Sequence, residues 1–291
     1  MSSVPVLDIG GSHVTAARVD LSTWTTVQGT RHRQVLDAHG TATDIVARLA
    51  AAARTLAPFD QQDVLCVAIP GPFDHTTGFA YFQDVGKFDA LYGIDLRQAL
   101  TRELGGAPLG ISFVHDATAF AVGEWLSGAA RGQRKVAAIT LGTGIGSAFL
   151  DDGHPTTDGP SVPLEGRVDL LRLDGTPLED HISTRAITRA YGGVSGVKQV
   201  TDAARQEDNK AIDVINTAFA ALARALAPWL KSFGAETLVV GGSMVGSWDV
   251  IKRPLREGLN TYGSREVNLC VSANPESSVE AGAAWLCSSV A

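Results

Sequence analysis

Three short stretches of the chain join an apolar run to glycines and a hydroxyl residue. In the first, "DIGGS", Asp8 precedes Gly10, Gly11 and Ser12. Glycine lets a ligand approach the backbone, and amides that point into a turn bind anionic oxygens. A carboxylate beside such a turn can hold a magnesium ion through water, as phosphate sites commonly require. The stretch therefore predicts a phosphate-binding turn, with Asp8 as the residue that holds the metal.

The same combination occurs twice more, in "LGTGIGS" and in "VVGGS". The residues concerned are Gly142, Thr143 and Gly144 in one and Gly241, Gly242 and Ser243 in the other. Any one of these turns is more simply a hairpin that needs a positive φ. Three of them, each directly after an apolar strand, favour nucleotide binding. The spacing fits neither a P-loop nor a dinucleotide-binding fingerprint.

A further acid, Asp116, stands where an apolar run ends and a helical pattern begins. Ligand sites of α/β sheets form at such strand ends. Transfer of a phosphoryl group to an alcohol needs alignment, charge neutralisation and an acceptor for the hydroxyl proton. Asp116 is the candidate for that acceptor. The alternative is that it only caps the helix.

Apolar periodicity predicts the elements that position these residues. Alternation predicts strands over 4–9 and 14–19, with a third within 25–34. Short apolar runs predict strands over 63–71, 107–117, 135–144 and 235–243, with a hairpin partner over 146–153. Helical spacing and caps predict helices over 41–57, 95–105, 116–130, 181–193, 208–234 and 277–291. The stretch 154–176 is expected to be loop with one short strand.

Length and composition set limits on the class of protein. A chain of 291 residues fits one large domain or two lobes. A net charge of -7 argues against nucleic acid or acidic lipid as partners. Three widely spaced cysteines argue against disulfides and against a cysteine zinc site. With neither a signal-peptide pattern nor an apolar run of about 20 residues, we expect a cytoplasmic protein without a membrane span.

The motifs, taken in order, resemble those of the ROK family (repressors, open reading frames and sugar kinases) in the actin-like ATPase superfamily. The matching segments are "DIGGSHVTAARVD", "VAIPGPFD", "VHDATAFAVGEW", "ITLGTGIG" and "VVGGS". The resemblance implies an α/β, two-lobed actin-like ATPase (ribonuclease H-like) fold, with mixed sheets flanked by helices. It implies an N-terminal lobe over 1–115, completed by the C-terminal helix at about 277–291, a second lobe over 116–276, and a cleft in which nucleotide and sugar meet.

The resemblance also implies an activity. Asp116 would be the general base of a kinase that uses ATP and Mg²⁺ to phosphorylate a primary hydroxyl of a small sugar or cyclitol. The implied substrate contacts are Gly71, Pro72, His115, Asp116, Glu165 and Glu179. The three glycine turns would hold the nucleotide, and we expect a homodimer. The alternatives are a polyphosphate/ATP glucokinase, which the negative charge does not favour, and a ligand-sensing member without catalysis.

Two departures from the family pattern concern the acceptor. His115 stands where the family has a sugar-binding asparagine, and Val168 stands where it has the histidine that heads a zinc site. A site built for particular hydroxyls rejects analogues that lack them. We therefore expect an acceptor other than plain glucose, such as a carbasugar or cyclitol with an exocyclic CH₂OH. The family's cysteine loop is absent too, and "RLDGTPLEDHIST" occupies its place.

The missing cysteine loop predicts that the protein carries no structural zinc, since a closed zinc site needs about four nitrogen or sulfur ligands. Elemental analysis of protein purified without chelator checks this. Stoichiometric zinc that resists dialysis would show that the region from His154 to His181 holds a metal after all.

Overall fold

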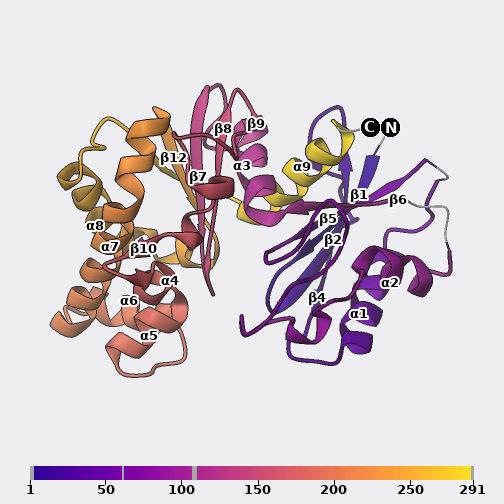
Figure 1. Ribbon diagram of the computed structural model, residues 1–291, viewed down its shortest axis with the longest axis horizontal. Coiled ribbons are helices and arrows are strands. Elements are labelled where there is room, and N and C mark those ends of the chain that lie inside the picture. The colour runs from indigo at the N-terminus through magenta and orange to yellow at the C-terminus, as the bar shows by residue number, and fades with distance from the viewer. Residues whose placement is uncertain (1–2, 61, 107–109, 290–291) are drawn as a thin grey trace. The chain divides into compact units, whose positions relative to one another are not determined.

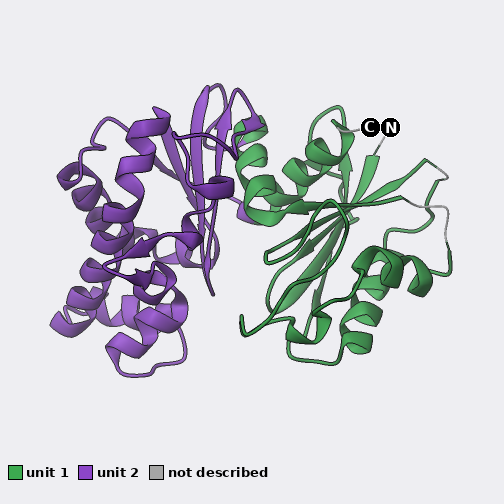
Figure 2. Ribbon diagram, in the orientation of Figure 1, with its two compact units in different colours: residues 1–127, 276–291 green, residues 128–275 purple. Residues whose placement is uncertain are grey.

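The computed structural model describes residues 3–60, 62–106 and 110–289. The chain divides into two compact units, coloured separately in Figure 2: unit 1, residues 1–127 and 276–291, and unit 2, residues 128–275. Residues 107–109, expected to begin a strand, and residues 290–291, expected to end the last helix, lie outside the described residues.

Unit 1 is built on a mixed sheet of six strands, seen in the indigo and magenta part of Figure 1. The strands are β1 (Ser3–Ile9), β2 (His13–Asp20), β3 (Thr25–Thr26), β4 (His32–Val35), β5 (Val64–Ile69) and β6 (Gly110–His115). β1 and β2 form the predicted antiparallel hairpin, whereas β5 and β6 continue the sheet in parallel to β1. The single strand expected within 25–34 is two short ones, β3 and β4, and each pairs with β2.

The helices of unit 1 are α1 (Ala42–Arg54), the 3-10 helix η1 (Asp89–Leu91), α2 (Leu96–Glu103), α3 (Asp116–Ser127) and α9 (Pro275–Ser288). The four α-helices predicted in unit 1 are present, and α2 follows the predicted cap at Asp95, but η1 was not predicted. The Thr41 side chain accepts from the Asp44 amide, and the Asp95 side chain accepts from the Gln98 amide. Each cap satisfies an amide that lacks a partner in the first helical turn.

The backbones of α3 and α9 touch at two glycines. A Cβ on Gly123 would lie 1.9 Å from the Ser278 carbonyl oxygen, and one on Gly282 would lie 1.8 Å from the Ala119 carbonyl oxygen. This close packing joins α3 to α9, so α3 belongs to unit 1. The sequence-based boundary at 115/116 therefore differs from the structural division, which falls after Ser127.

Unit 2 is also built on a mixed sheet, with five strands in the order β13-β12-β7-β8-β9. Its strands are β7 (Lys135–Leu141), β8 (Ile145–Asp151), β9 (His154–Pro155), β12 (Thr237–Gly241) and β13 (Asn268–Val271). β7 and β8 are antiparallel, and β12 runs parallel to both β7 and β13. The expected loop over 154–176 also holds 3-10 turns η2 (Leu164–Gly166) and η3 (Val168–Leu170) and strand β10 (Arg172–Leu173), which pairs with β11 (Thr176–Pro177).

The helices of unit 2 differ more from expectation. They are α4 (Glu179–Ile182), α5 (Thr184–Tyr191), α6 (Val197–Arg205), α7 (Asn209–Phe233), the 3-10 helix η4 (Ser243–Ser247) and α8 (Trp248–Thr261). The helix expected over 181–193 is two helices, because Ser183 is extended and caps α5. Neither α6 nor α8 was predicted from the sequence. α8 contains Pro254, and proline inside a sequence usually predicts the end of a helix, which explains why α8 was missed.

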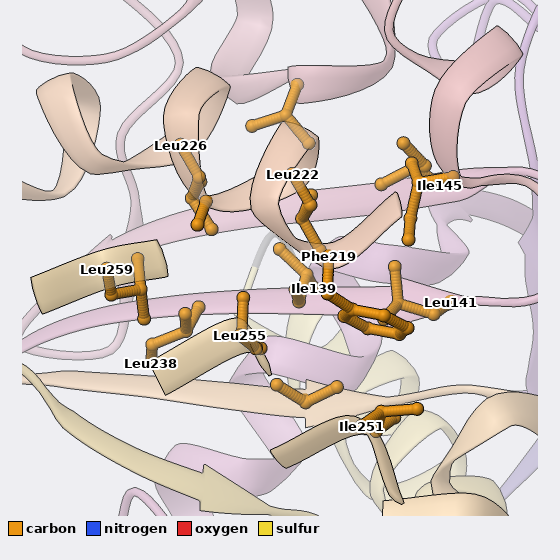
Figure 3. Close-up of a cluster of buried hydrophobic side chains, with 14 of the residues drawn as sticks. Ile139, Leu141, Ile145, Phe219, Leu222, Leu226, Leu238, Ile251, Leu255 and Leu259 are labelled. Carbon is orange, nitrogen blue, oxygen red and sulfur yellow. The ribbon is translucent and has the colours of Figure 1, made fainter. Parts of the chain in front are cut away.

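The long helix α7 is the centre of the unit 2 core. Phe219, Leu222 and Leu226 of α7 pack in one cluster with residues of β7 and α8 (Figure 3). Within the described residues, α7 alone is long and apolar enough to cross a membrane by length and composition. Its apolar face is buried in the core, which accounts for that composition.

Replacing Gly282 with alanine should destabilise unit 1, because the new Cβ would overlap the Ala119 backbone. Overpacking of this kind typically costs about 1–3 kcal/mol, and occasionally more. Thermal and denaturant unfolding would measure the loss. Gly246→Ala is the control, since a Cβ there meets nothing within 4 Å. Equal stability of the two variants would contradict the close α3–α9 contact.

Candidate active site

Unit 1 gathers its chemically active residues at one edge of the sheet. Parallel β1, β5 and β6 lie side by side, with Asp8 opposite Ala68 and Ile69 opposite His115. Their carboxyl ends therefore meet at the same edge. The predicted residues that follow or close these strands are Asp8, Gly10, Gly11, Ser12, Gly71, Pro72, His115 and Asp116. Topology thus brings together residues that are more than 100 positions apart in the sequence.

The turn between β1 and β2 leaves backbone amides uncovered. The Gly10 amide donates to the His13 carbonyl, and the Leu36 amide donates to the Ser12 carbonyl. The amides of Gly11 and Ser12 have no hydrogen-bond partner among the described residues. Gly10, Gly11 and Ser12 are all exposed. Amides of this kind are what an anionic oxygen would bind.

The glycines of this turn are not required by the backbone. Neither Gly10 nor Gly11 has a positive φ. A Cβ on Gly10 would lie 3.5 Å from the His13 carbonyl oxygen, an ordinary contact, and one on Gly11 would lie 3.8 Å from Cδ of Lys87. The fold itself would tolerate larger residues here. Glycine leaves the turn without side chains at these two positions.

Asp116 opens α3, as predicted, and its side chain satisfies one amide of the first helical turn. Its Oδ1 accepts from the Ala117 amide at 2.7 Å and lies 3.6 Å from Nε2 of His115. The Asp116 side chain is 32% exposed, so one face of the carboxylate remains accessible. This hydrogen bond and proton acceptance are therefore compatible in this residue.

A second histidine, His75, stands beside this pair and was missed in the sequence. Its Nε2 lies 3.0 Å from the Ile69 carbonyl, and its ring meets the His115 ring edge-on at 5.6 Å. Burial lowers the pKa of His75, which favours a neutral ring. Its place in "PGPFDH", just after β5, was the one available signal.

Asp8 lies among other acids. Burial, followed by the charges of Asp116, Glu280 and Glu276, raises the pKa of Asp8 to about 8, and only Arg33 opposes them. Asp8, Thr15 and Arg33 are paired in a row across β1, β2 and β4. The two glutamates come from α9 at the far end of the sequence. This part of unit 1 therefore favours a proton or a cation near Asp8.

Unit 2 brings its two glycine turns together at another sheet edge. β7 and β12 are parallel neighbours, with Gly241 opposite Thr140. A Cβ on Gly142 would lie 3.2 Å from Oγ of Ser243, which places the two turns in contact. Gly241 is buried as the last residue of β12, whereas Thr143 and Ser243 are exposed. Gly142, Thr143, Gly144, Gly242 and Ser243 thus form one surface.

Glu179 is fixed against the first of these turns. Its Oε1 accepts from the Ile145 amide at 2.9 Å, and a Cβ on Gly144 would lie 2.3 Å from the same oxygen. The Gly142 carbonyl accepts from both the amide and the hydroxyl of Thr184, at the start of α5. The turn is therefore held by α4 and α5, with Glu179 half-buried beside it.

Glu165 and Val168, the remaining residues of unit 2 that the sequence singled out, lie in different environments. Glu165 is exposed, has a φ of 57°, and pairs with Arg167 at 3.4 Å. Val168, by contrast, is fully buried in the hydrophobic core of unit 2. Its amide donates to the buried Ser147 hydroxyl, which fixes that orientation. The expectation that Val168 faces a substrate hydroxyl is therefore wrong, because the side chain belongs to the core.

The structure gives no donor set for a tightly held metal. Within the described residues, no three or more His, Cys, Asp or Glu side chains are placed to hold a metal ion. His181 contacts the Thr176 hydroxyl through Nε2 at 2.7 Å, and His154 is exposed at β9. A magnesium ion at Asp8 would therefore depend on water and phosphate for its other ligands.

Comparison with known proteins extends over nearly the whole chain. The ROK family model matches residues 5–162 and 174–289. A curated glucokinase from Thermotoga maritima is 24% identical over 247 residues, which is 75% of this chain and 76% of that protein. The described fold is also that of solved proteins, and the expected α/β actin-like class is confirmed.

Two of those solved structures have different roles. A ROK family glucokinase from Streptomyces griseus, in complex with glucose and AMPPNP, has a TM-score of 0.77 and 21% identity, covering 98% of this chain and 99% of that one. A ROK family transcriptional regulator, a homolog of the E. coli MLC protein, has a TM-score of 0.76 and 18% identity, covering 99% of this chain and 78% of that one. The fold alone does not separate these roles.

The raised pKa of Asp8 predicts a pH-dependent stability. An acid whose pKa is higher in the folded protein binds more protons when folded, so the free energy of unfolding falls as pH rises from about 4 to about 8. The slope from this one group is at most about 1.4 kcal/mol per pH unit. Asp8→Asn should remove that loss, so the variant gains stability relative to the wild type as pH rises.

Denaturant unfolding of both proteins at several pH values, in chelator-treated buffer, measures the difference. Asp213→Asn, at an exposed position on α7, controls for loss of one carboxylate. Parallel stability curves for Asp8→Asn and wild type would contradict the raised pKa.

Proposed function

The chain belongs to the ROK family, and we propose that it is an ATP-dependent kinase that transfers the γ-phosphoryl group to a primary hydroxyl of a sugar or a sugar-like cyclitol. One observation carries the proposal: a single sheet edge in unit 1 holds both an accessible acid at a helix start, Asp116, and a turn with open amides at Gly11 and Ser12. Phosphoryl transfer needs an acid and an anion cradle of that kind. The similarity to a glucokinase supports the same reaction class.

The first glycine turn suits the donor's phosphates. The open amides of Gly11 and Ser12 would donate to phosphate oxygens, and the absence of side chains on Gly10 and Gly11 would let those oxygens approach. A magnesium ion held near Asp8 through water would neutralise charge on the β- and γ-phosphates. The acids around Asp8 fit a cation there, since they favour positive charge.

Asp116 would act on the acceptor. Because Oδ1 is bonded to the Ala117 amide, the carboxylate is held in one orientation at the helix start. Its other oxygen is then available to accept the proton of a substrate hydroxyl as the phosphoryl group is transferred. His115, 3.6 Å away, would contact the same substrate where the family has asparagine.

Unit 2 carries the second and third glycine turns. The surface formed by Gly142–Gly144 and Gly242–Ser243 would bind the nucleoside side of the donor. Glu179 keeps one oxygen on the Ile145 amide, and its second oxygen would accept from a ring hydroxyl. Glu165 is exposed and would do the same.

The proposed phosphoryl acceptor is a small ring compound that carries a primary hydroxyl. His115 and Val168 both differ from the family pattern, but Val168 is a core residue. Of the two, only His115 therefore bears on which acceptor is bound. Replacing asparagine by histidine changes which hydroxyls can be paired, and an unpaired buried polar group costs about 1–3 kcal/mol. The expected preference for a cyclitol over glucose therefore depends on His115 alone.

A non-catalytic, ligand-sensing role is the second candidate, because a transcriptional regulator shares the fold. The two functions differ in turnover and not in ligand binding. Two assays across hexoses, amino sugars and cyclitols separate them: coupled ADP release with Mg-ATP as donor, and direct detection of the phosphorylated product with polyphosphate as donor. Saturable sugar binding without any product would favour the sensor.

Asp116→Asn should lower kcat about 10²–10⁴-fold, the usual effect of losing a general base. Acceptor affinity, measured by calorimetry, should change little, because asparagine keeps the shape and the hydrogen bond to the Ala117 amide. Asp213→Asn should retain full turnover and serves as the matched control. Turnover of Asp116→Asn within about threefold of wild type, less than ~1 kcal/mol in barrier, would remove Asp116 from the catalytic role.

A further inference from the structure

Lys87 lies against the phosphate-binding turn from a distant part of the sequence. Its Cδ would be 3.8 Å from a Cβ on Gly11, an ordinary van der Waals separation. The stem of Lys87 thus passes beside the open amides of this turn, and the ammonium lies two bonds beyond Cδ. No feature of the sequence pattern around "DVGKFD" pointed to this contact.

The segment that carries Lys87 is held in place by the next residue, Phe88. Phe88 has a φ of 61° and is buried, and its amide donates to the Ala38 carbonyl at 2.7 Å. Its ring packs on Phe82 with centroids 5.3 Å apart. A left-handed backbone at a bulky residue persists only where the surroundings hold it. Phe88 therefore fixes where the Lys87 side chain starts.

Among the described residues, the charge of Lys87 has no counter-ion. It is half-buried, and neither a hydrogen bond nor an ion pair joins it to any part of the chain that the structure describes. Two arginines of the same unit are already paired: Arg31 with Glu280 at 2.6 Å, and Arg33 with Glu276. Partly buried charges are usually paired. An anion on the neighbouring turn would pair with Lys87.

We propose that Lys87 contacts a phosphate oxygen of the phosphoryl donor bound at the Gly10–Gly11 turn. The proposal rests on the kinase function above and adds a donor-binding residue to it. The acids near Asp8 would repel a polyanionic donor, so a cation at this turn would complement a magnesium ion bound there. An ammonium is a compact point charge that suits a single phosphate oxygen.

The test is calorimetric binding to the full chain, with Mg-ATP, tripolyphosphate and adenosine as probes. Lys87→Met keeps the stem and removes the charge, and it should weaken binding of Mg-ATP and tripolyphosphate about 10- to 100-fold, the usual range for a charged hydrogen bond. Adenosine affinity should not change. The salt dependence of Mg-ATP binding should become shallower, because one cation–anion contact is lost. Lys87→Arg, which keeps the charge, should restore most of the affinity.

Lys252→Met is the matched control, since Lys252 is exposed on α8; it should bind all three probes like the wild type. Mg-ATP affinity of Lys87→Met within about twofold of wild type, or ~0.4 kcal/mol, would overturn the proposal. A raised acceptor KM with unchanged Mg-ATP binding would also overturn it, and would assign Lys87 to the acceptor.

The same measurements separate this inference from the proposed function. Wild-type protein that binds Mg-ATP but transfers no phosphoryl group would refute the kinase, while the Lys87 contact would still be decided by the binding ratio. Wild-type protein that binds neither Mg-ATP nor tripolyphosphate would overturn both proposals.

Discussion

The backbone contact between α3 and α9 is the constraint on which the candidate site in unit 1 depends. Gly123 and Gly282 let the two helices approach until carbonyl oxygens stand where side chains would be. α3 begins at Asp116, and α9 carries Glu276 and Glu280. The same contact therefore orients the candidate base and brings two acids from the end of the chain toward Asp8. The buried Glu124 carboxylate, which accepts from the Ser278 hydroxyl at 2.6 Å, reinforces the crossing.

The acids gathered in this way leave unit 1 with an excess of negative charge around Asp8. Glu280 is fully buried, and although its Oε2 pairs with Arg31, its Oε1 has no hydrogen-bond partner in the described residues. Burial and like charge then raise the pKa of Asp8 to about 8. A cation placed here would offset part of this negative charge. A polyanionic donor can approach only with cations of its own or with those of the chain, which is why Lys87 beside the turn bears on the proposed chemistry.

The sequence predicted what is local. Strand ends, caps and glycine turns depend on a few neighbouring residues, so β1, β2, α2, α7 and the position of Asp116 could be read directly. It did not predict contacts between distant segments: His75 beside His115, Lys87 beside Gly11, or α3 joined to α9.

The sequence also misplaced the side chain of Val168. The family pattern marks that position as polar, but the 3-10 turn η3 and the bond from the Val168 amide to Ser147 direct the side chain into the core. Orientation within an irregular loop depends on packing that no short motif encodes.

The three glycine turns, alike in sequence, are glycine-rich for different reasons. Gly242 has a φ of 85°, and a Cβ there would lie 2.4 Å from the Leu141 carbonyl oxygen, so the fold itself requires glycine. Gly144 needs room for the Glu179 carboxylate, which is a flexible side chain and a weaker demand. Gly10 and Gly11 meet neither constraint. The need for a positive φ therefore accounts for Gly242, which joins β12 to η4, and does not account for Gly10 and Gly11. Since folding does not require glycine at the β1–β2 turn, access to the open amides is the remaining physical reason, and this turn argues most strongly for an anionic ligand.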